Sequence, residues 1–407
     1  MASVAAAGME TIDEDELAWL ALVLTPGMGP RRVLEAVRGV QRAAQVFGLA
    51  LTELEALRLP AQAAQWIFDG RAREAAEEEW TKAAKLGVAI VSYESELYPE
   101  RLKEIYDPPP VLWVKGDAGL LGRASIAVVG TRRPTPYGTG MAERLSRDLA
   151  ARGLLIVSGM ARGIDTAAHK GALVAGKPTV AVWGTGADVV YPKENAKLAE
   201  QILETGGAVV SELPLGTFPA PQNFPRRNRI LSGLSLGVLV VEASENSGTR
   251  VTARCAADQG RDVYAVPGNV TNPGSWTPNT LIKQGAQLTA TWEDVWESLP
   301  SQVKVELMGV GESKTEASAS DLPGLLAEAG GESNPRSGPE SGAGAPLRGR
   351  EAVVFGVLRQ DAALQMDEIL ERVEAQLSSA EVFTALFELE LAGRIRSLPG
   401  KNYVRSF

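Results

Sequence analysis

The sequence predicts an α/β protein whose core is a Rossmann-like parallel sheet. Between residues 125 and 268, short apolar runs alternate with segments of helical pattern. The runs end in small residues and read SIAVVGT, LLIVSG, TVAVWG, GAVVSE, GVLVVEA and DVYAVPG. Continuous apolar strands that alternate with helices are typical of a parallel sheet covered on both faces. In such a sheet the binding site lies at the carboxyl ends of the strands.

The residues before position 110 show a mostly helical pattern, in the stretches DEDELAWLALVL, GPRRVLEAV, LTELEAL and RAREAAEEEWTKAAKLG. We therefore predict a helical domain over residues 1–85 and the sheet domain over residues 86–300. The stretch LALVLTPGMGPRRVLEAV resembles a helix-hairpin-helix or sterile-alpha-motif unit. Its Arg31 and Arg32 could contact a phosphate, and the packing of two helices for stability explains the pattern equally well.

The remaining residues predict a linker and a small module. Residues 301–349 are rich in Gly, Ser, Pro and Glu, a composition typical of a flexible linker. Residues 350–407 predict helices near 351–359, 366–376 and 379–392, followed by two strands in GRIRSLPGKNYVRSF. This order of elements resembles a winged helix.

The third helix of this module would be the recognition helix of a winged helix. It carries Glu381, Glu388 and Glu390 and no cation, so in a major groove it would place carboxylates against phosphates. The wing is basic and could touch DNA. We favour a protein partner for this module over weak binding of duplex DNA.

Composition excludes several classes of protein. The chain has 407 residues, 45% hydrophobic and 22% charged, as in globular proteins of two or three domains. No apolar run reaches membrane-spanning length, and we expect a cytoplasmic protein without a membrane partner. One His and one Cys form neither a disulfide nor a His/Cys zinc site, so no metal is expected. Cys255 is predicted to be a buried small apolar residue, not a nucleophile.

The net charge of −9 is distributed unevenly. Residues 1–125 carry 13 basic and 19 acidic residues, and residues 300–407 carry 11 and 16. Residues 126–299 carry 17 basic and 15 acidic residues, a net charge of +2. Any polyanion is therefore expected to bind the middle domain.

Glycines or small hydroxyl residues, together with cations, follow most of the predicted strands. Glycine lets backbone N–H groups approach an anion, a following helix N-terminus adds positive potential, and the cations supply charge where phosphates would lie. Because these loops converge on one edge of the sheet, we predict a phosphate-binding face. Its candidate residues are Gly130, Thr131, Arg132, Ser158, Gly159, Arg162, Lys193, Arg227, Asn228, Arg229, Ser247, Gly248 and Thr249.

A dinucleotide does not fit this face. The stretch WGTGADVV lacks the third glycine of G-x-G-x-x-G, and the first predicted strand leads into GTRRPTPYG. We therefore expect no cofactor.

His169, the only histidine, lies four residues after Asp165 on a predicted helix, so the two can pair. Catalysis would require a nucleophile or a second acid or base within reach, and none stands out. We predict a helix-surface histidine restrained by its acidic neighbour and no catalytic residue.

The middle domain resembles the family of DNA-processing protein A (DprA, also called Smf). The resemblance rests on an ordered set of motifs over about residues 90–295. They are VVGTRRPTPYG, SGMARGIDTAAH, VYPKEN, SELPLG, FPRRNRILSGLS, VVEASENSGTRVTARCAADQGRDVYAVPG and NTLIKQGA.

This resemblance implies a protein that binds single-stranded DNA, forms a homodimer and loads the RecA recombinase onto incoming strands during natural transformation. It also implies which cations line the groove for single-stranded DNA: Arg132, Arg162, Lys193, Arg227 and Arg229. We predict that the dimer surface lies near the apolar residues Leu281 and Ile282.

The wider superfamily includes phosphoribohydrolases with the motif P-G-G-x-G-T-x-x-E. Here the equivalent stretch is SENSGTRVTA, with Thr252 at the position of the glutamate. The resemblance therefore implies binding without hydrolysis. The alternative is a nucleotide-binding, phosphoribohydrolase-like enzyme that uses another acid, such as Asp258.

Aromatic side chains could stack bases of a single strand beside the cations. The candidates are Tyr137, Tyr191, Phe218 and Phe224. For Phe218 and Phe224, filling the loop core is an equally good explanation.

Overall fold

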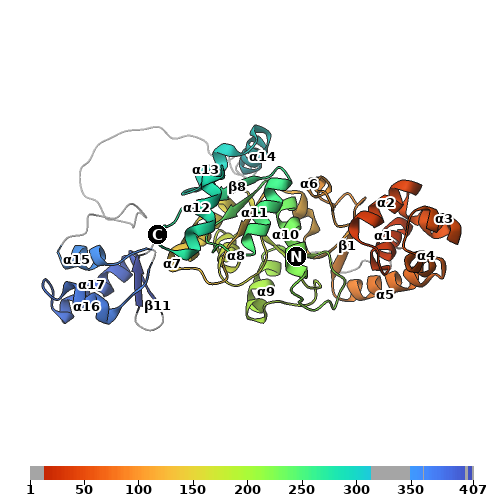
Figure 1. Ribbon diagram of the computed structural model, residues 1–407. Coiled ribbons are helices and arrows are strands. Elements are labelled where there is room, and N and C mark those ends of the chain that lie inside the picture. The colour runs from red at the N-terminus through yellow and green to blue at the C-terminus, as the bar shows by residue number, and fades with distance from the viewer. Residues whose placement is uncertain (1–12, 313–348, 361, 399–401, 406–407) are drawn as a thin grey trace, which may run out of the picture. The chain divides into compact units, whose positions relative to one another are not determined.

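The structure is a computed structural model that describes residues 13–312, 349–360, 362–398 and 402–405 (Figure 1). The apolar runs form strands of one nine-stranded sheet. The strand order is β1-β2-β6-β5-β4-β3-β7-β8-β9. The six predicted strands are confirmed as β3 (Ser125–Val129), β4 (Leu155–Ser158), β5 (Thr179–Val182), β6 (Ala208–Ser211), β7 (Gly237–Val240) and β8 (Asp262–Ala265). Together with β9 (Gln287–Leu288) they run parallel, which confirms the Rossmann-like core.

Two further strands were not predicted, and they make the sheet mixed. The strands β1 (Val88–Ser92) and β2 (Val111–Gly116) pair with each other antiparallel, and β2 pairs antiparallel with β6. The strand β1 lies in the region for which the sequence pattern indicated helices, and β2 lies just after it. Residues Val111–Val114 of β2 are buried, so this short apolar run is stabilised by its two neighbouring strands.

The order of the strands reverses between β3 and β7. From β3 the chain proceeds outward through β4, β5 and β6, and then returns to β7 on the other side of β3. The helices that follow β3 and β7 therefore lie on opposite faces of the sheet, which opens a crevice at the carboxyl ends of these strands. This topological switch point is the place where a doubly wound sheet binds its ligand.

Helices cover both faces of the sheet. Helices α7 (Pro136–Ala151), α8 (Ile164–Val174) and α9 (Ala196–Glu204) pack in succession on one face. The chain direction reverses after β6, so α10 (Asn223–Leu234) and α11 (Thr249–Asp258) pack together on the other face. Helices α12 (Trp276–Lys283) and α13 (Trp292–Ser298) follow β8 and β9.

The N-terminal helices form their own core and dock against the antiparallel end of the sheet. They are α1 (Glu14–Leu24), α2 (Pro30–Val40), η1 (Ala43–Gly48), α3 (Leu51–Ala56), α4 (Ala61–Phe68) and α5 (Arg71–Lys85). The buried carboxylate of Glu79 accepts hydrogen bonds from Trp113 Nε1 at 3.0 Å and from Leu215 N at 2.7 Å. A short helix, α6 (Glu100–Lys103), lies between β1 and β2 in the sequence.

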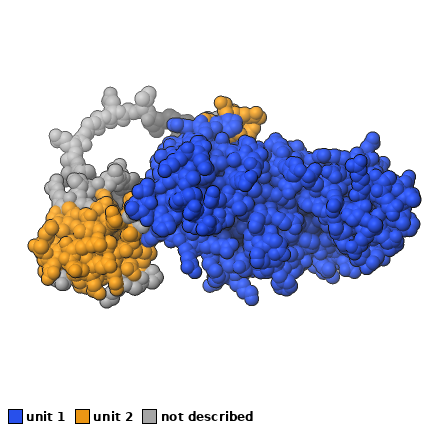
Figure 2. Space-filling model, viewed as in Figure 1, with its two compact units in different colours: residues 1–300 blue, residues 301–407 orange. Residues whose placement is uncertain are grey.

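The chain divides into two compact units, residues 1–300 and residues 301–407 (Figure 2). The second unit contains α14 (Ser301–Glu312), α15 (Arg350–Val357), β10 (Leu364–Gln365), α16 (Met366–Val373), α17 (Ser379–Leu391), β11 (Ile395–Leu398) and β12 (Asn402–Arg405). Its strands form an antiparallel sheet in the order β10-β12-β11. Helix α14 occupies the start of the predicted linker, so that part of the prediction is wrong. Residues 313–348 lie outside the described residues.

No helix within the described parts of the chain has the length and apolar character needed to cross a membrane.

Candidate nucleic-acid interface

The loops after β3 and β7 meet at the switch point and are tied together by Glu242. Its backbone carbonyl accepts a hydrogen bond from Thr131 N at 2.5 Å. Its buried carboxylate accepts hydrogen bonds from Thr135 N at 2.8 Å and Thr135 Oγ1 at 2.6 Å. Thr135 is also the N-cap of α7, and Pro136 follows at the first helical position. Sequence reasoning missed Glu242, although a lone acid at the end of an apolar strand was a usable signal.

Arg227 reaches from α10 to the ends of β4 and β5. Its Nη1 donates a hydrogen bond to Val182 O at 2.7 Å, and the residue is only 6% exposed. Gly159 makes this position possible, because a Cβ there would lie 1.8 Å from Arg227 Nη1. Burial lowers the pKa of Arg227 to about 10, so its guanidinium remains charged at neutral pH. Its Nε has no hydrogen-bond partner among the described residues.

Asp165 is the buried acid beside this arginine. Its carboxylate accepts hydrogen bonds from Gly159 N at 3.1 Å and Ala161 N at 3.3 Å, which hold the loop after β4 in place. Burial raises the pKa of Asp165 to about 6, against the opposing effects of Arg227 and the two backbone hydrogen bonds. Both hydrogen bonds come from backbone amides of the loop and end on Oδ2, so Asp165 shapes the floor of the site.

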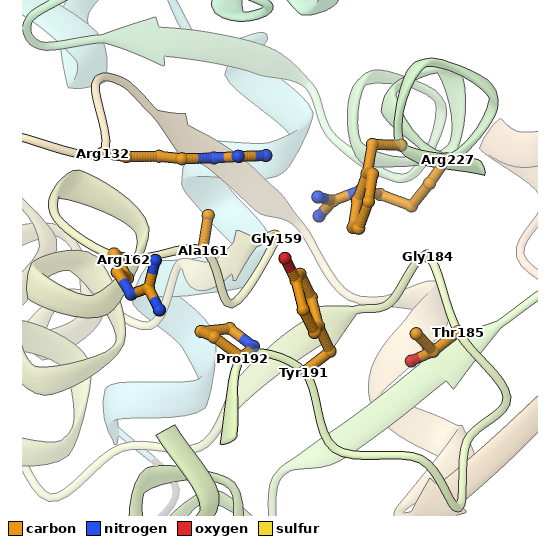
Figure 3. A pocket seen from close by; sticks show the side chains of 10 residues that line it. Arg132, Gly159, Ala161, Arg162, Gly184, Thr185, Tyr191, Pro192 and Arg227 are labelled. Atoms are coloured by element: carbon orange, nitrogen blue, oxygen red, sulfur yellow. The ribbon is translucent and has the colours of Figure 1, made fainter. Parts of the chain in front are cut away.

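The strand-end loops enclose two adjoining hollows, which we call the trough. Arg132 and Arg162 line the first hollow from two strand-end loops and Arg227 lines it from α10. Figure 3 shows Arg132 and Arg227 extending toward each other near Tyr191. The remaining residues of the first hollow are Gly159, Ala161, Gly184, Thr185, Tyr191, Pro192 and Phe224. Arg132, Ala161, Phe224 and Arg227 also line the second hollow, with Gly130, Thr131, Arg133, Asn228, Ser247, Gly248, Thr249 and Thr252. Ten of the thirteen predicted site residues are thus brought together.

The trough combines anion-binding groups with aromatic rings. Helix α11 begins at Thr249, a residue of the second hollow, so the positive end of its dipole lies there. Its first N–H groups are hydrogen-bonded locally, that of Thr249 to Ser247 Oγ at 3.2 Å. Tyr191 is 39% exposed, and its ring centroid lies 5.6 Å from that of Phe224. The guanidinium carbon of Arg132 lies 5.8 Å from the Phe224 ring centroid. Positive charge and an exposed aromatic surface therefore occupy one concavity.

The aromatic candidates outside the trough differ from one another. Phe218 is 77% exposed, which argues against the loop-core explanation for this residue. Tyr137 instead donates a hydrogen bond from its hydroxyl to Pro267 O at 2.7 Å and is partly buried.

Lys193 lies at the edge of the trough and begins the short helix η3 (Lys193–Asn195). It is exposed and directly follows Pro192, a residue of the first hollow. The next residue, Glu194, forms an ion pair with Arg162. Sequence reasoning missed this acid, even though it stands between two motif residues, Lys193 and Asn195.

Two predicted binding residues do not face the trough. Ser158 is fully buried, and its Oγ donates a hydrogen bond to Val128 O at 2.6 Å. Arg229 forms ion pairs with Asp107 at 3.1 Å and with the buried carboxylate of Glu212. Two residues along a helix are about 200° apart, so Arg229 cannot share the side of α10 that carries Arg227.

His169 does not lie on the surface, so the prediction of a helix-surface histidine is wrong. It is fully buried, and its Nδ1 lies 2.9 Å from Thr179 Oγ1, which in turn donates to Ile156 O. Asp165 does not pair with it, because that carboxylate is bound to the loop amides. The helix α8 is covered by the sheet and by α7, a burial that the local pattern of small residues did not reveal.

Cys255 is half-buried on α11, less than predicted, and burial raises the pKa of its thiol. Within the part of the chain that the structure describes, no group of three or more His, Cys, Asp or Glu side chains is placed to hold a metal ion.

The N-terminal hairpin uses its arginines within the domain. Arg32 Nη1 donates a hydrogen bond to Gly27 O at 3.0 Å, and Arg31 pairs with Glu35 at 3.5 Å. The guanidinium of Arg31 also lies 4.5 Å from the ring centroid of Tyr106. These contacts favour the structural explanation of the hairpin.

Comparisons with known proteins agree with this geometry. The family described as DNA recombination-mediator protein A matches residues 89–300, and the DprA winged helix domain matches residues 338–401. Protein Smf of Escherichia coli (strain K12) is 41% identical over 323 residues, which cover 78% of this chain and 77% of that protein. DNA processing protein DprA of Bacillus subtilis (strain 168) is 43% identical over 217 residues, 53% of this chain and 73% of that protein.

A solved structure agrees as well. The X-ray structure of DNA processing protein A from Streptococcus pneumoniae aligns with a TM-score of 0.61 at 35% identity, covering 72% of this chain and 99% of that one. The resemblance drawn from the motifs and the winged-helix prediction are both confirmed. The chain belongs to the DNA recombination-mediator protein A family.

Proposed function

We propose that this protein binds single-stranded DNA by its phosphate backbone in the trough. The observation that carries the proposal is the meeting of Arg132, Arg162 and Arg227 around one concavity. The first two lie in separate strand-end loops and the third lies on α10. Each side chain is far from the others in sequence, and a polyanionic ligand accounts for their gathering in an otherwise acidic chain.

A single strand suits the trough better than a duplex. Unpaired bases can stack on exposed rings such as Tyr191 while the backbone follows the cations. Lys193, at the edge of the first hollow, would extend the line of phosphate contacts. Serine and threonine hydroxyls and the start of α11 would bind phosphate oxygens in the second hollow.

We further propose that binding occurs without catalytic turnover. Oδ2 of Asp165, the acid that lines the second hollow, accepts hydrogen bonds from two backbone amides, which gives this side chain a structural role. Asp258 lies at the opposite end of α11 and pairs with Arg254 at 3.7 Å. The competing hypothesis, a phosphoribohydrolase-like enzyme, is tested by incubation with nucleoside monophosphates, since released base that is lost in Arg132→Ala would favour it.

The handover of the strand to RecA, a homodimeric state and a cytoplasmic location complete the proposal. They follow from membership of the family and from the resemblance in the motifs. For the dimer, Ile282 on α12 stays a candidate, whereas Leu281 packs partly against the core of the sheet domain.

The test is a double charge reversal, Arg132→Glu with Lys193→Glu, measured by fluorescence anisotropy with labelled oligothymidylate. We expect affinity to fall by about a hundredfold or more, because two phosphate contacts are lost and two repulsions are added. The wild-type log Kd should rise with log salt by about 0.7 for each phosphate contacted.

A matched control changes the net charge equally and leaves the trough intact. Lys85→Glu with Arg254→Glu reverses two exposed cations on α5 and α11. We expect its affinity to stay within about threefold of the wild type, because screened charges outside the site act weakly. Arg229→Met should lower the melting temperature by leaving Glu212 unpaired, without changing the salt slope of the folded protein. Equal losses in the trough variant and the control would refute the assignment.

A further inference from the structure

The trough contains an internal anion beside one of its cations. The carboxylate of Glu194 is in contact with the guanidinium of Arg162, and both side chains are 60% exposed. Arg162 belongs to the loop between β4 and α8, whereas Glu194 belongs to η3 after β5. A backbone hydrogen bond and Arg162 together hold the pKa of Glu194 below its usual range, so this carboxylate is ionised at neutral pH.

The fold holds this ion pair in place. Asn195, which is buried, donates from Nδ2 to Met160 O and to Thr166 Oγ1, both at 2.9 Å. These bonds fasten η3 to the loop that carries Arg162. The backbone of Glu194 is therefore kept within reach of the arginine by its neighbour in the chain.

We propose that Glu194 occupies, in the DNA-free protein, the position at Arg162 that a strand phosphate takes in the complex. Glu194 thereby lowers the affinity for single-stranded DNA and determines its dependence on salt. This inference rests on the proposed function. It assigns Glu194 as a residue that tunes binding, and it assigns the pair with Arg162 as the contact that opens when a strand enters.

The ion pair between Glu194 and Arg162 is weak enough for a phosphate to replace the carboxylate. An exposed ion pair contributes little net stability, so a phosphate can replace the carboxylate at little cost. A phosphate that binds an unpaired cation releases a counterion. When a phosphate binds Arg162, however, the displaced Glu194 takes up a cation. The two effects offset each other, so this contact adds almost nothing to the salt slope.

The experiment compares Glu194→Gln with the wild type in the full chain, using labelled oligothymidylate over a series of KCl concentrations. Glutamine keeps the size of the side chain and removes its charge. We expect affinity at low salt to rise by about three- to tenfold, and the salt slope to steepen by about 0.7, the value of one phosphate contact. Glu200→Gln removes an equally exposed carboxylate from α9 and should leave the slope unchanged.

A double-mutant cycle ties the effect to Arg162. In an Arg162→Ala background, Glu194→Gln should no longer steepen the slope. Weaker binding by Glu194→Gln would overturn the inference, since it would mean that the carboxylate orients Arg162 productively. An unchanged slope would overturn it as well. Failure of the proposed function is a separate result, because binding would then survive charge reversal at Arg132 and Lys193.

Discussion

Arg227 shows how one residue can serve both the fold and the site. Removing a guanidinium from water is costly unless it is hydrogen-bonded and paired. Here Arg227 donates one hydrogen bond to Val182 O, and the carboxylate of Asp165 raises the pKa of Arg227, against the lowering effect of burial. The side chain is thus held in one orientation before any strand arrives, so little conformational entropy is lost on binding.

His169 makes the stability of the protein depend on pH. Burial, and then the charge of Arg227, lower the pKa of its imidazole to about 3. The unfolded chain would bind a proton near pH 6.5, whereas the folded protein would not. This histidine therefore contributes stability that is complete above about pH 6.5 and declines as the pH falls toward 3.

NMR tests this directly, because His169 is the only histidine of the chain. We expect its imidazole Cε1–H resonance to keep a constant chemical shift between about pH 5 and pH 8 in the folded protein. Denaturant should restore a titration near pH 6.5. A midpoint close to 6.5 in the folded state would show that the ring is accessible to water.

At the scale of elements, the loop between β6 and α10 extends the trough. It is attached to the loop after β5 by hydrogen bonds from Gly186 N to Thr217 O at 3.0 Å and from Gly216 N to an oxygen of Asp188 at 2.8 Å. Gly184 and Thr185 of that neighbouring loop line the first hollow. Phe218 therefore stands exposed on a braced segment next to the site.

We predict that Phe218 stacks on a base of the bound strand. Phe218→Ala should weaken binding of oligothymidylate by about 1–3 kcal/mol, the value of one base–aromatic stack. Phe218→Trp should bind normally, with indole fluorescence that is quenched when the strand is added. Phe68→Ala, at a ring 56% exposed on α4, is the matched control and should bind as the wild type does. Equal affinities for Phe218→Ala and the wild type would contradict the prediction.

At the scale of the whole molecule, positive charge and binding residues are concentrated in one domain. All trough residues lie between Val129 and Thr252, within the first compact unit. The winged-helix unit presents a different surface on α17. Phe383 and Phe387 are 51% and 62% exposed, and Glu388 pairs with Arg350 at 2.6 Å.

We therefore predict that a chain ending at Pro300 retains the affinity of the full chain for single-stranded DNA within about threefold, because all residues that line the trough lie in that unit. Anisotropy titrations of both chains at the same salt concentration provide the measurement. A loss of tenfold or more would show that the winged-helix unit also contacts the strand.

The parallel core and ten of the residues that line the trough were predictable from the sequence. Strands β3 to β7 are short, mostly apolar and buried, so their burial on both faces is predictable from local composition. Arg132 and Arg162 lie in the loops that leave β3 and β4, and Arg227 lies near the start of the helix after β6. The parallel topology brings these segments to one edge of the sheet. Arg132, Arg162 and Arg227 were predictable for this reason.

Which neighbours these residues contact depends on the packing of elements that are distant in the sequence. Arg227 and Arg229 stand in one motif, yet α10 turns one toward the trough and the other toward Glu212. His169 became a core residue because α8 is covered by elements distant in sequence. The pairing of β1 with β2, and of Glu194 with Arg162, likewise depends on long-range contacts, which no local pattern specifies.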